Sequence, residues 1–186
     1  MNASTRNDAV VRLADYQPPA WRVEHVDLTF DLGIDEALVG ARLHLRRERD
    51  EPLRLDGEEL ELLEVALDGR VLADNDYMLD ACSLTIPGAH DGSVLETKVR
   101  IAPARNTKLS GLYLSGSRDA GFLLTQCEAQ GFRRITFFPD RPDVLAKYSV
   151  TLRADRARFP VLLAGGDPDG AGELPDGRHW ARFADP

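Results

Sequence analysis

The stretch "TQCEAQGF", residues 125–132, carries the residues best suited to chemistry: Gln126 and Glu128 flank Cys127. If residues 123–127 form a strand, Gln126 and Glu128 project from one face and Cys127 points the other way, into the core. A carboxylate can balance the charge of an ammonium group, and an amide oxygen can accept one of its hydrogen bonds. The pair therefore fits a site for an amine, although the same spacing also fits a solvated strand end.

The sequence contains no motif typical of a metal site, a calcium loop or a nucleophilic serine or cysteine. A catalytic metal needs about three converging protein ligands, but the histidines show no i,i+4 spacing and no H-E-x-x-H motif; they are His25, His44, His90 and His179. The acidic loop from Asp167 to Glu173 has Ala171 where a calcium loop needs an oxygen ligand. The serines lack a G-x-S-x-G motif, and Glu128 beside Cys127 would raise the pKa of the thiol. We therefore expect no catalytic residue and no metal ligand in this chain.

Composition and charge narrow the class of protein. The 186 residues are 43% hydrophobic and 29% charged, which is typical of a soluble globular domain. The net charge of −8 argues against nucleic acid as a partner, because phosphate binding needs clustered cations. No segment approaches the roughly 18 apolar residues that a membrane helix requires, so we expect no membrane partner.

The two cysteines, Cys82 and Cys127, are too few for a disulfide scaffold. The start of the chain has no apolar core of a secretory signal. We therefore expect a cytoplasmic protein, with two buried and unreactive thiols; a single bridge between Cys82 and Cys127 stays open as an alternative.

Alternation of apolar and polar residues predicts the fold. Val26 to Leu32 and Val39 to Leu45 alternate on either side of a turn at residues 33–36, which predicts a β-hairpin. Further short runs follow at close spacing, separated by Gly, Pro and Asp. We predict an all-β fold, an antiparallel β-sandwich or a set of curved sheets.

One short helical turn is expected from Asp140 to Tyr148. Asp140 can cap it, Pro142 suits its first turn, and Asp143 favours the positive end of its dipole. Residues 1–15 read as a polar leader, and their composition is compatible with disorder. No linker divides residues 16–186, so we predict a single domain there.

The full segment "TQCEAQGFRRITFFPDRPDVLAKY", residues 125–148, resembles the bacterial aminopeptidase N family of zinc-dependent gluzincin aminopeptidases. Three other segments resemble the same family: "DYQPPAWRVEHVDLTFDL", "PLRLDGEEL" and "ELPDGRHWARFADP". The resemblance extends from Tyr16 to Pro186. It implies a saddle-shaped β domain that precedes a thermolysin-like catalytic domain, which this sequence lacks.

The resemblance also implies roles for individual residues. Glu128 is expected to bind the free α-amino group of a peptide substrate, and Gln126 to line the pocket for its first side chain. Gln130 stands where relatives often carry Glu, and we assign it no role. The expected cofactor is zinc, held by the missing catalytic domain and not by this chain.

The partners expected from this resemblance are the N-terminus of a peptide substrate and the chain's own catalytic domain. A surface made to meet that domain could also drive self-association of the 186-residue fragment. Two alternatives stay open: a freestanding β-sandwich module that binds peptide or carbohydrate, and a scaffold relative without zinc.

Overall fold

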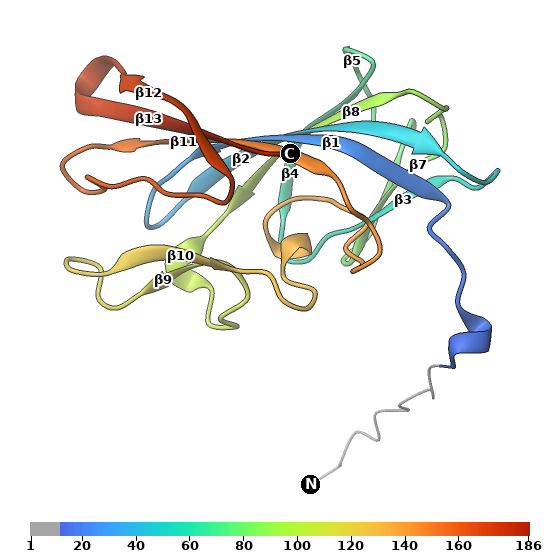
Figure 1. Cartoon of the computed structure of the whole chain (residues 1–186), viewed down its shortest axis with the longest axis horizontal. Helices are drawn as coiled ribbons and strands as arrows, with labels where there is room; N and C mark the ends of the chain where they lie inside the picture. The colour runs from blue at the N-terminus through green and yellow to red at the C-terminus, as the bar shows by residue number, and fades with distance from the viewer. Residues whose placement is uncertain (1–11) are drawn as a thin grey trace, which may run out of the picture.

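β1 (Trp21–Asp31) and β2 (Ala37–Arg47) form the hairpin that the alternation predicts, and they lie at the centre of the largest sheet (Figure 1). The computed structural model describes residues 12–186. Residues 1–11 of the predicted leader lie outside the described residues. Near its end, Leu13–Asp15 form the short 3₁₀ turn η1.

The largest sheet has eight strands in the order β12-β13-β11-β1-β2-β8-β4-β5. Its other members are β4 (Glu61–Leu67), β5 (Arg70–Val71), β8 (Val94–Ile101), β11 (Lys147–Asp155), β12 (Asp167–Glu173) and β13 (Arg178–Asp185). Neighbouring strands are antiparallel except for β1 and β11, which run parallel. The predicted all-β fold of curved, mainly antiparallel sheets is confirmed.

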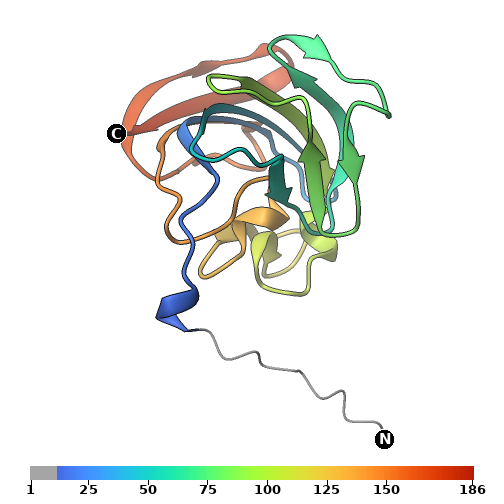
Figure 2. The same ribbon diagram turned by 90° about the vertical axis from the view of Figure 1, so that its right-hand side faces the viewer.

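Two small sheets and short loops lie under this large sheet, which arches over them in Figure 2. One contains β3 (Leu53–Asp56), β7 (Ser83–Ile86) and β6 (Met78–Leu79), in that order; the other is the ribbon of β9 (Gly111–Ser115) and β10 (Phe122–Gln126). The remaining 3₁₀ turns are η2 (Pro103–Arg105), η3 (Phe132–Arg134) and η4 (Pro175–Gly177).

A register shift in β1 decides which of its side chains face the core. Trp21 and Val23 are buried before the shift between Val23 and His25, and the buried series then continues at Val26, Leu28 and Phe30. One extra residue in a strand reverses the facing of every later residue. The shift therefore keeps both halves of β1 apolar toward the same core.

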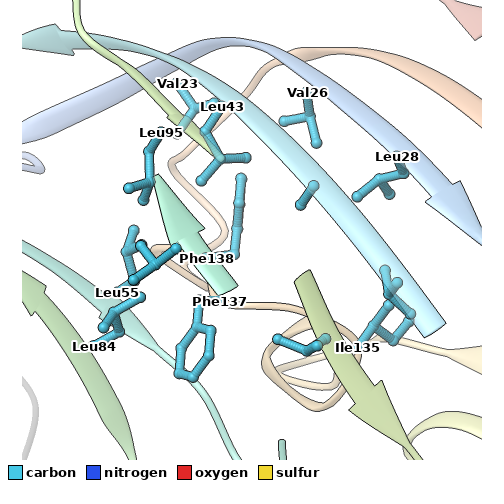
Figure 3. Packing of buried hydrophobic residues seen from close by; sticks show 14 of the residues in the cluster. Val23, Val26, Leu28, Leu43, Leu55, Leu84, Leu95, Ile135, Phe137 and Phe138 are labelled. Carbon is cyan, nitrogen blue, oxygen red and sulfur yellow. The ribbon is translucent and has the colours of Figure 1, made fainter. Parts of the chain in front are cut away.

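The core joins the large sheet to the loop that follows η3 (Figure 3). Ile135, Phe137 and Phe138 from this loop are each at most 3% exposed. The backbone of Phe138 pairs with that of Asp56, with N–O distances of 2.8 and 3.0 Å in the two directions. Burying each of these side chains contributes about 1.5–3 kcal/mol, so the loop is held as firmly as a strand.

The prediction of a helical turn from Asp140 to Tyr148 is wrong. The chain makes only a β-turn, closed by the Val144 amide bonding to the Arg141 carbonyl at 3.2 Å, and then enters β11 at Lys147. Asp140 is buried and accepts hydrogen bonds from Arg133 instead of capping a helix. Pairing of β11 with β1 supplies more backbone bonds than one isolated helical turn, which is costly to nucleate.

A substitution at Gly57 can test this packing, because the Cα of Gly57 faces the ring of Phe137 and leaves no room for a side chain. A Cβ at residue 57 would lie 2.3 Å from the Phe137 ring. We expect Gly57→Ala to lower the free energy of unfolding by about 1–3 kcal/mol, the usual cost of overpacking, as measured by urea denaturation. Gly88→Ala is the matched control, since a Cβ there meets nothing within 4 Å; equal effects of the two changes would contradict this account.

Candidate functional site

Gln126 and Glu128 lie together at the end of the β9–β10 ribbon. β10 ends at Gln126, and residues 128–130 form a turn, so the prediction that the strand extends through Cys127 is wrong by one residue. Both polar side chains are nevertheless exposed, and the Gln126 side-chain amide donates to the Glu128 carbonyl oxygen at 3.4 Å. The peptide bond that joins Glu128 to Ala129 is cis. The turn, and not a common strand face, brings the pair together.

Gly131 allows this turn to close tightly. Its amide donates to the Cys127 carbonyl oxygen at 2.7 Å. A Cβ at residue 131 would lie 2.4 Å from the Gln126 carbonyl oxygen and 2.8 Å from Ser110 Oγ. Only glycine fits there, because a side chain at this position would push the turn off the ribbon.

Arg134 holds the turn against the ribbon from beneath. Its guanidinium is buried, donates to the Ser110 carbonyl oxygen at 3.2 Å, and pairs with Glu59 at 2.6 Å and Glu58 at 3.4 Å. The hydrogen bond from Arg134 lowers the pKa of Glu59. A planar guanidinium can serve several acceptors at fixed angles, and here it joins η3 to β9 and to the chain after β3.

Arg133 secures the other side of the same loop. Its backbone amide and its Nε both donate to Asp140 Oδ2 at 3.1 Å, and its Nη2 donates to the Asp140 carbonyl oxygen at 3.0 Å. The backbone amide of Asp140 donates in turn to Asp56 Oδ2 at 3.2 Å. Neither arginine is predicted as a site residue from the sequence, where the signal is a pair of adjacent arginines between aromatic residues.

The segment before β1 is hydrogen-bonded to this loop through Tyr16 and Gln17. The Tyr16 hydroxyl donates to Asp143 Oδ2 at 2.9 Å, and Arg141 donates to the Gln17 carbonyl oxygen at 2.8 Å. The hydrogen bond from Arg141, with a further one from Tyr16, lowers the pKa of Asp143 to about 2. Asp143 therefore acts as an ion-pair acceptor and not as a helix N-terminal charge.

The cysteines differ from the prediction. Cys82 is exposed and Cys127 is half-buried, and both are free thiols. The Cys82–Cys127 bridge that the sequence left open is therefore not formed, and the expected burial of Cys82 is wrong. Burial, with a smaller contribution from the Asp140 carboxylate, raises the pKa of the Cys127 thiol to about 11, so this thiol is a poor nucleophile at neutral pH.

An apolar groove of about 570 Å³ runs beside Cys127, between β10 and residues 161–165. Its floor comes from β1 and β11, and Leu28, Phe30, Val150 and Leu152 contribute to it. Phe122 and Leu124 on one wall and Val161 and Leu163 on the other are each more than 40% exposed. The alternation of apolar residues in the sequence does not predict this groove.

Residues 12–186 contain no group of three or more His, Cys, Asp or Glu side chains that could hold a metal ion. Within the same residues, no helix is long and apolar enough to cross a membrane. What the site offers chemically is an exposed carboxylate, that of Glu128, on the same turn as an exposed amide, that of Gln126, which donates to the Glu128 backbone carbonyl.

The chain belongs to the Peptidase M1 N-terminal domain family, whose model matches residues 40–186. It is 49% identical to aminopeptidase N of Caulobacter vibrioides over 184 residues, which cover 98% of this chain and 21% of that protein. It is 41% identical to aminopeptidase N of Escherichia coli over 174 residues, covering 92% of this chain and 19% of that protein. The chain thus spans about a fifth of the length of these relatives.

Solved structures share the same fold. Aminopeptidase A of Legionella pneumophila, in complex with aspartic acid, matches 94% of this chain and 21% of its own with a TM-score of 0.82 and 32% identity. An M1 zinc metallopeptidase of Deinococcus radiodurans matches 90% of this chain and 39% of its own with a TM-score of 0.70. At 16% identity, the second match concerns the fold alone.

Arg134→Lys should loosen the turn that carries Glu128. One ammonium cannot reach the Ser110 carbonyl and both glutamates at once, so we expect a loss of about 1.5–3 kcal/mol in the free energy of unfolding. Hydrogen exchange of residues 126–131 should become faster. Arg153→Lys, on the exposed side of β11, is the control, and an Arg134→Lys variant as stable as this control would contradict the role of Arg134.

The two thiols should alkylate at very different rates. An ordinary thiol has a pKa of about 8.5, so at neutral pH Cys127 should carry on the order of a hundredfold less thiolate. Mass spectrometry with iodoacetamide should show Cys82 labelled first, and the rate at Cys127 should rise with pH up to about 11. Cys82→Ser and Cys127→Ser variants assign each signal, and rapid labelling of Cys127 at neutral pH would contradict its burial.

Proposed function

We propose that this chain is the non-catalytic N-terminal domain of a zinc-dependent aminopeptidase, an enzyme that removes N-terminal amino acids from peptides. The observation that carries the proposal is the 49% identity to an aminopeptidase N across 98% of this chain. The turn after β10 supports it as well, because it exposes the side chains of Gln126 and Glu128 to solvent two residues apart.

Glu128 binds the free α-amino group of the substrate in this proposal. An exopeptidase must distinguish a terminal ammonium from an internal amide, and a carboxylate does so because only the ammonium carries a charge. A charge-assisted hydrogen bond of this kind contributes about 1.5–3 kcal/mol. The tight turn at Gly131 and the buried Arg134 favour this role, since they hold the backbone that carries Glu128 and so reduce the entropy lost when it binds.

Gln126 lines the pocket for the first side chain of the substrate. Its amide group donates to the Glu128 backbone carbonyl oxygen, which holds the Gln126 side chain over the turn that carries Glu128. An amide accepts and donates hydrogen bonds without carrying charge, which suits a pocket that receives different side chains next to an ammonium.

Zinc and the groups that cleave the peptide bond belong to a catalytic domain outside this chain. In this proposal the chain contributes contacts to the substrate and takes no part in bond cleavage. Its partners are the N-terminus of a peptide and the catalytic domain of the longer protein. A cytoplasmic location stays a prediction.

A chimera tests the role of Glu128. This chain would replace the matching region of the Caulobacter aminopeptidase N, and hydrolysis of amino-acid p-nitroanilides would be measured. We expect Glu128→Gln to lower kcat/KM roughly tenfold to more than a hundredfold, because it removes one charge-assisted hydrogen bond.

The control is Glu64→Gln, which removes an exposed carboxylate from β4. Circular dichroism of each chimera checks that it is folded. A folded Glu128→Gln chimera with unchanged kcat/KM would contradict the amine-binding role, and a folded but inactive unmodified chimera would contradict the assignment of the domain.

A further inference from the structure

The apolar groove beside β10 exposes large side chains on both of its walls. Phe122 and Leu124 on the β10 wall are 58% and 42% exposed, and Val161 and Leu163 on the opposite wall are 69% and 78% exposed. Among the described residues that line the groove, only Asp185 is charged. Contiguous apolar surface of this kind, in a chain that is 29% charged, is typical of a site that another body covers.

Hydrogen bonds hold the two walls in place. Arg158 Nη2 donates to the carbonyl oxygens of Arg118 and Gly121, both at 2.9 Å, and so joins the second wall to the turn between β9 and β10. His179 Nε2 on β13 donates to the carbonyl oxygen of Phe159 at 2.7 Å. The groove therefore has its shape before an occupant arrives, which reduces the entropy lost when a partner packs there.

The relatives contain a large body that this chain lacks. The chain covers 21% of aminopeptidase N of Caulobacter vibrioides and 19% of that of Escherichia coli, so about four fifths of each of these proteins has no counterpart here. A second copy of this chain is a poorer occupant of the groove, because two copies with a net charge of −8 each repel one another.

The end of β13 lies at the groove. Asp185 is the last residue of β13 and lines the groove. In the proposed longer protein, the polypeptide that follows Pro186 therefore leaves from the rim of this surface. A domain tethered so close to a surface has a high effective concentration there, which favours its packing on that surface over contact with a separate molecule.

β10 connects the groove to the candidate site. Leu124 lines the groove, Gln126 ends the same strand two residues later, and Glu128 follows in the turn. If Glu128 holds the terminal amine of a peptide that another domain cleaves, that domain must lie against this end of β10. The groove and the candidate site thus require the same neighbour.

We propose, on the basis of the function proposed above, that the catalytic domain of the longer protein packs an apolar surface into this groove. Its contacts bury Phe122, Leu124, Val161 and Leu163. Large apolar interfaces hold neighbouring domains rigidly, whereas small polar ones leave them free to move. The packing therefore fixes the distance from Glu128 to the peptide bond that is cleaved.

Thiol labelling measures whether the groove is covered. Leu163→Cys, in a Cys82→Ser background, would be made in the 186-residue chain and in the Caulobacter chimera, and maleimide labelling of residue 163 would be followed by mass spectrometry. We expect labelling at least about tenfold slower in the chimera, because residue 163 is then reached only when the domains open. The control is Leu145→Cys, at a leucine 84% exposed and outside the groove, which should label equally fast in both.

A charged substitution provides a second test. Val161→Asp should leave the urea midpoint of the 186-residue chain unchanged, because residue 161 is exposed there. In the chimera, the same change should lower kcat/KM at least about tenfold, since it buries an unpaired carboxylate between the domains. Val161→Ile, which keeps the surface apolar, should retain the kcat/KM of the unmodified chimera.

The outcomes separate this packing from the proposed function. Equally fast labelling of residue 163 in the chain and in an active chimera would overturn the packing and leave the proposed function standing. A folded but inactive unmodified chimera would contradict the proposed function, and the labelling rates would still decide the packing. Labelling of the 186-residue chain that slows as its own concentration rises would show that a second copy covers the groove, and would overturn the proposal.

Discussion

The buried guanidinium of Arg134 is the interaction on which the site depends. It reaches the carbonyl of Ser110 at the start of the ribbon and the carboxylates of Glu58 and Glu59 after β3. These segments are far apart in sequence, and no regular strand pairing joins them. A buried charge is costly unless its hydrogen bonds are satisfied, so once folding places Arg134 there, all three segments must take these positions. The backbone of the turn with Gln126 and Glu128 is rigid for the same reason.

Packing and polar contacts cooperate around this point. Phe137 and Phe138 anchor the loop in the core on one side of η3, and the tight turn at Gly131 closes it on the other. Glycines are needed where other atoms leave no room for a side chain: Gly131 against the Gln126 carbonyl, and Gly111 against Arg134 Cβ at 2.7 Å. The loop therefore has one arrangement, although it contains little regular secondary structure. This is the condition under which an exposed carboxylate can be used for recognition.

The proposed function gives a reason for a rigid surface turn in a domain whose residues 12–186 hold no group of metal ligands. In the proposed longer enzyme, a surface that serves a neighbouring active site must hold its residues in place before the substrate arrives. Preorganisation reduces the entropy lost on binding.

Local patterns in the sequence determined the strands: alternation predicts β1 and β2 because one face of each is buried. Spacing alone left Gln126 and Glu128 open between a binding pair and a solvated strand end, and the family resemblance assigned them roles. Tertiary structure decided the rest. The register shift in β1, the turn in place of a helix at Asp140, the exposure of Cys82 and the ion pairs of Arg133 and Arg134 all depend on residues distant in the chain. Such contacts leave no local pattern, because each residue's environment is set by segments that only folding brings to it.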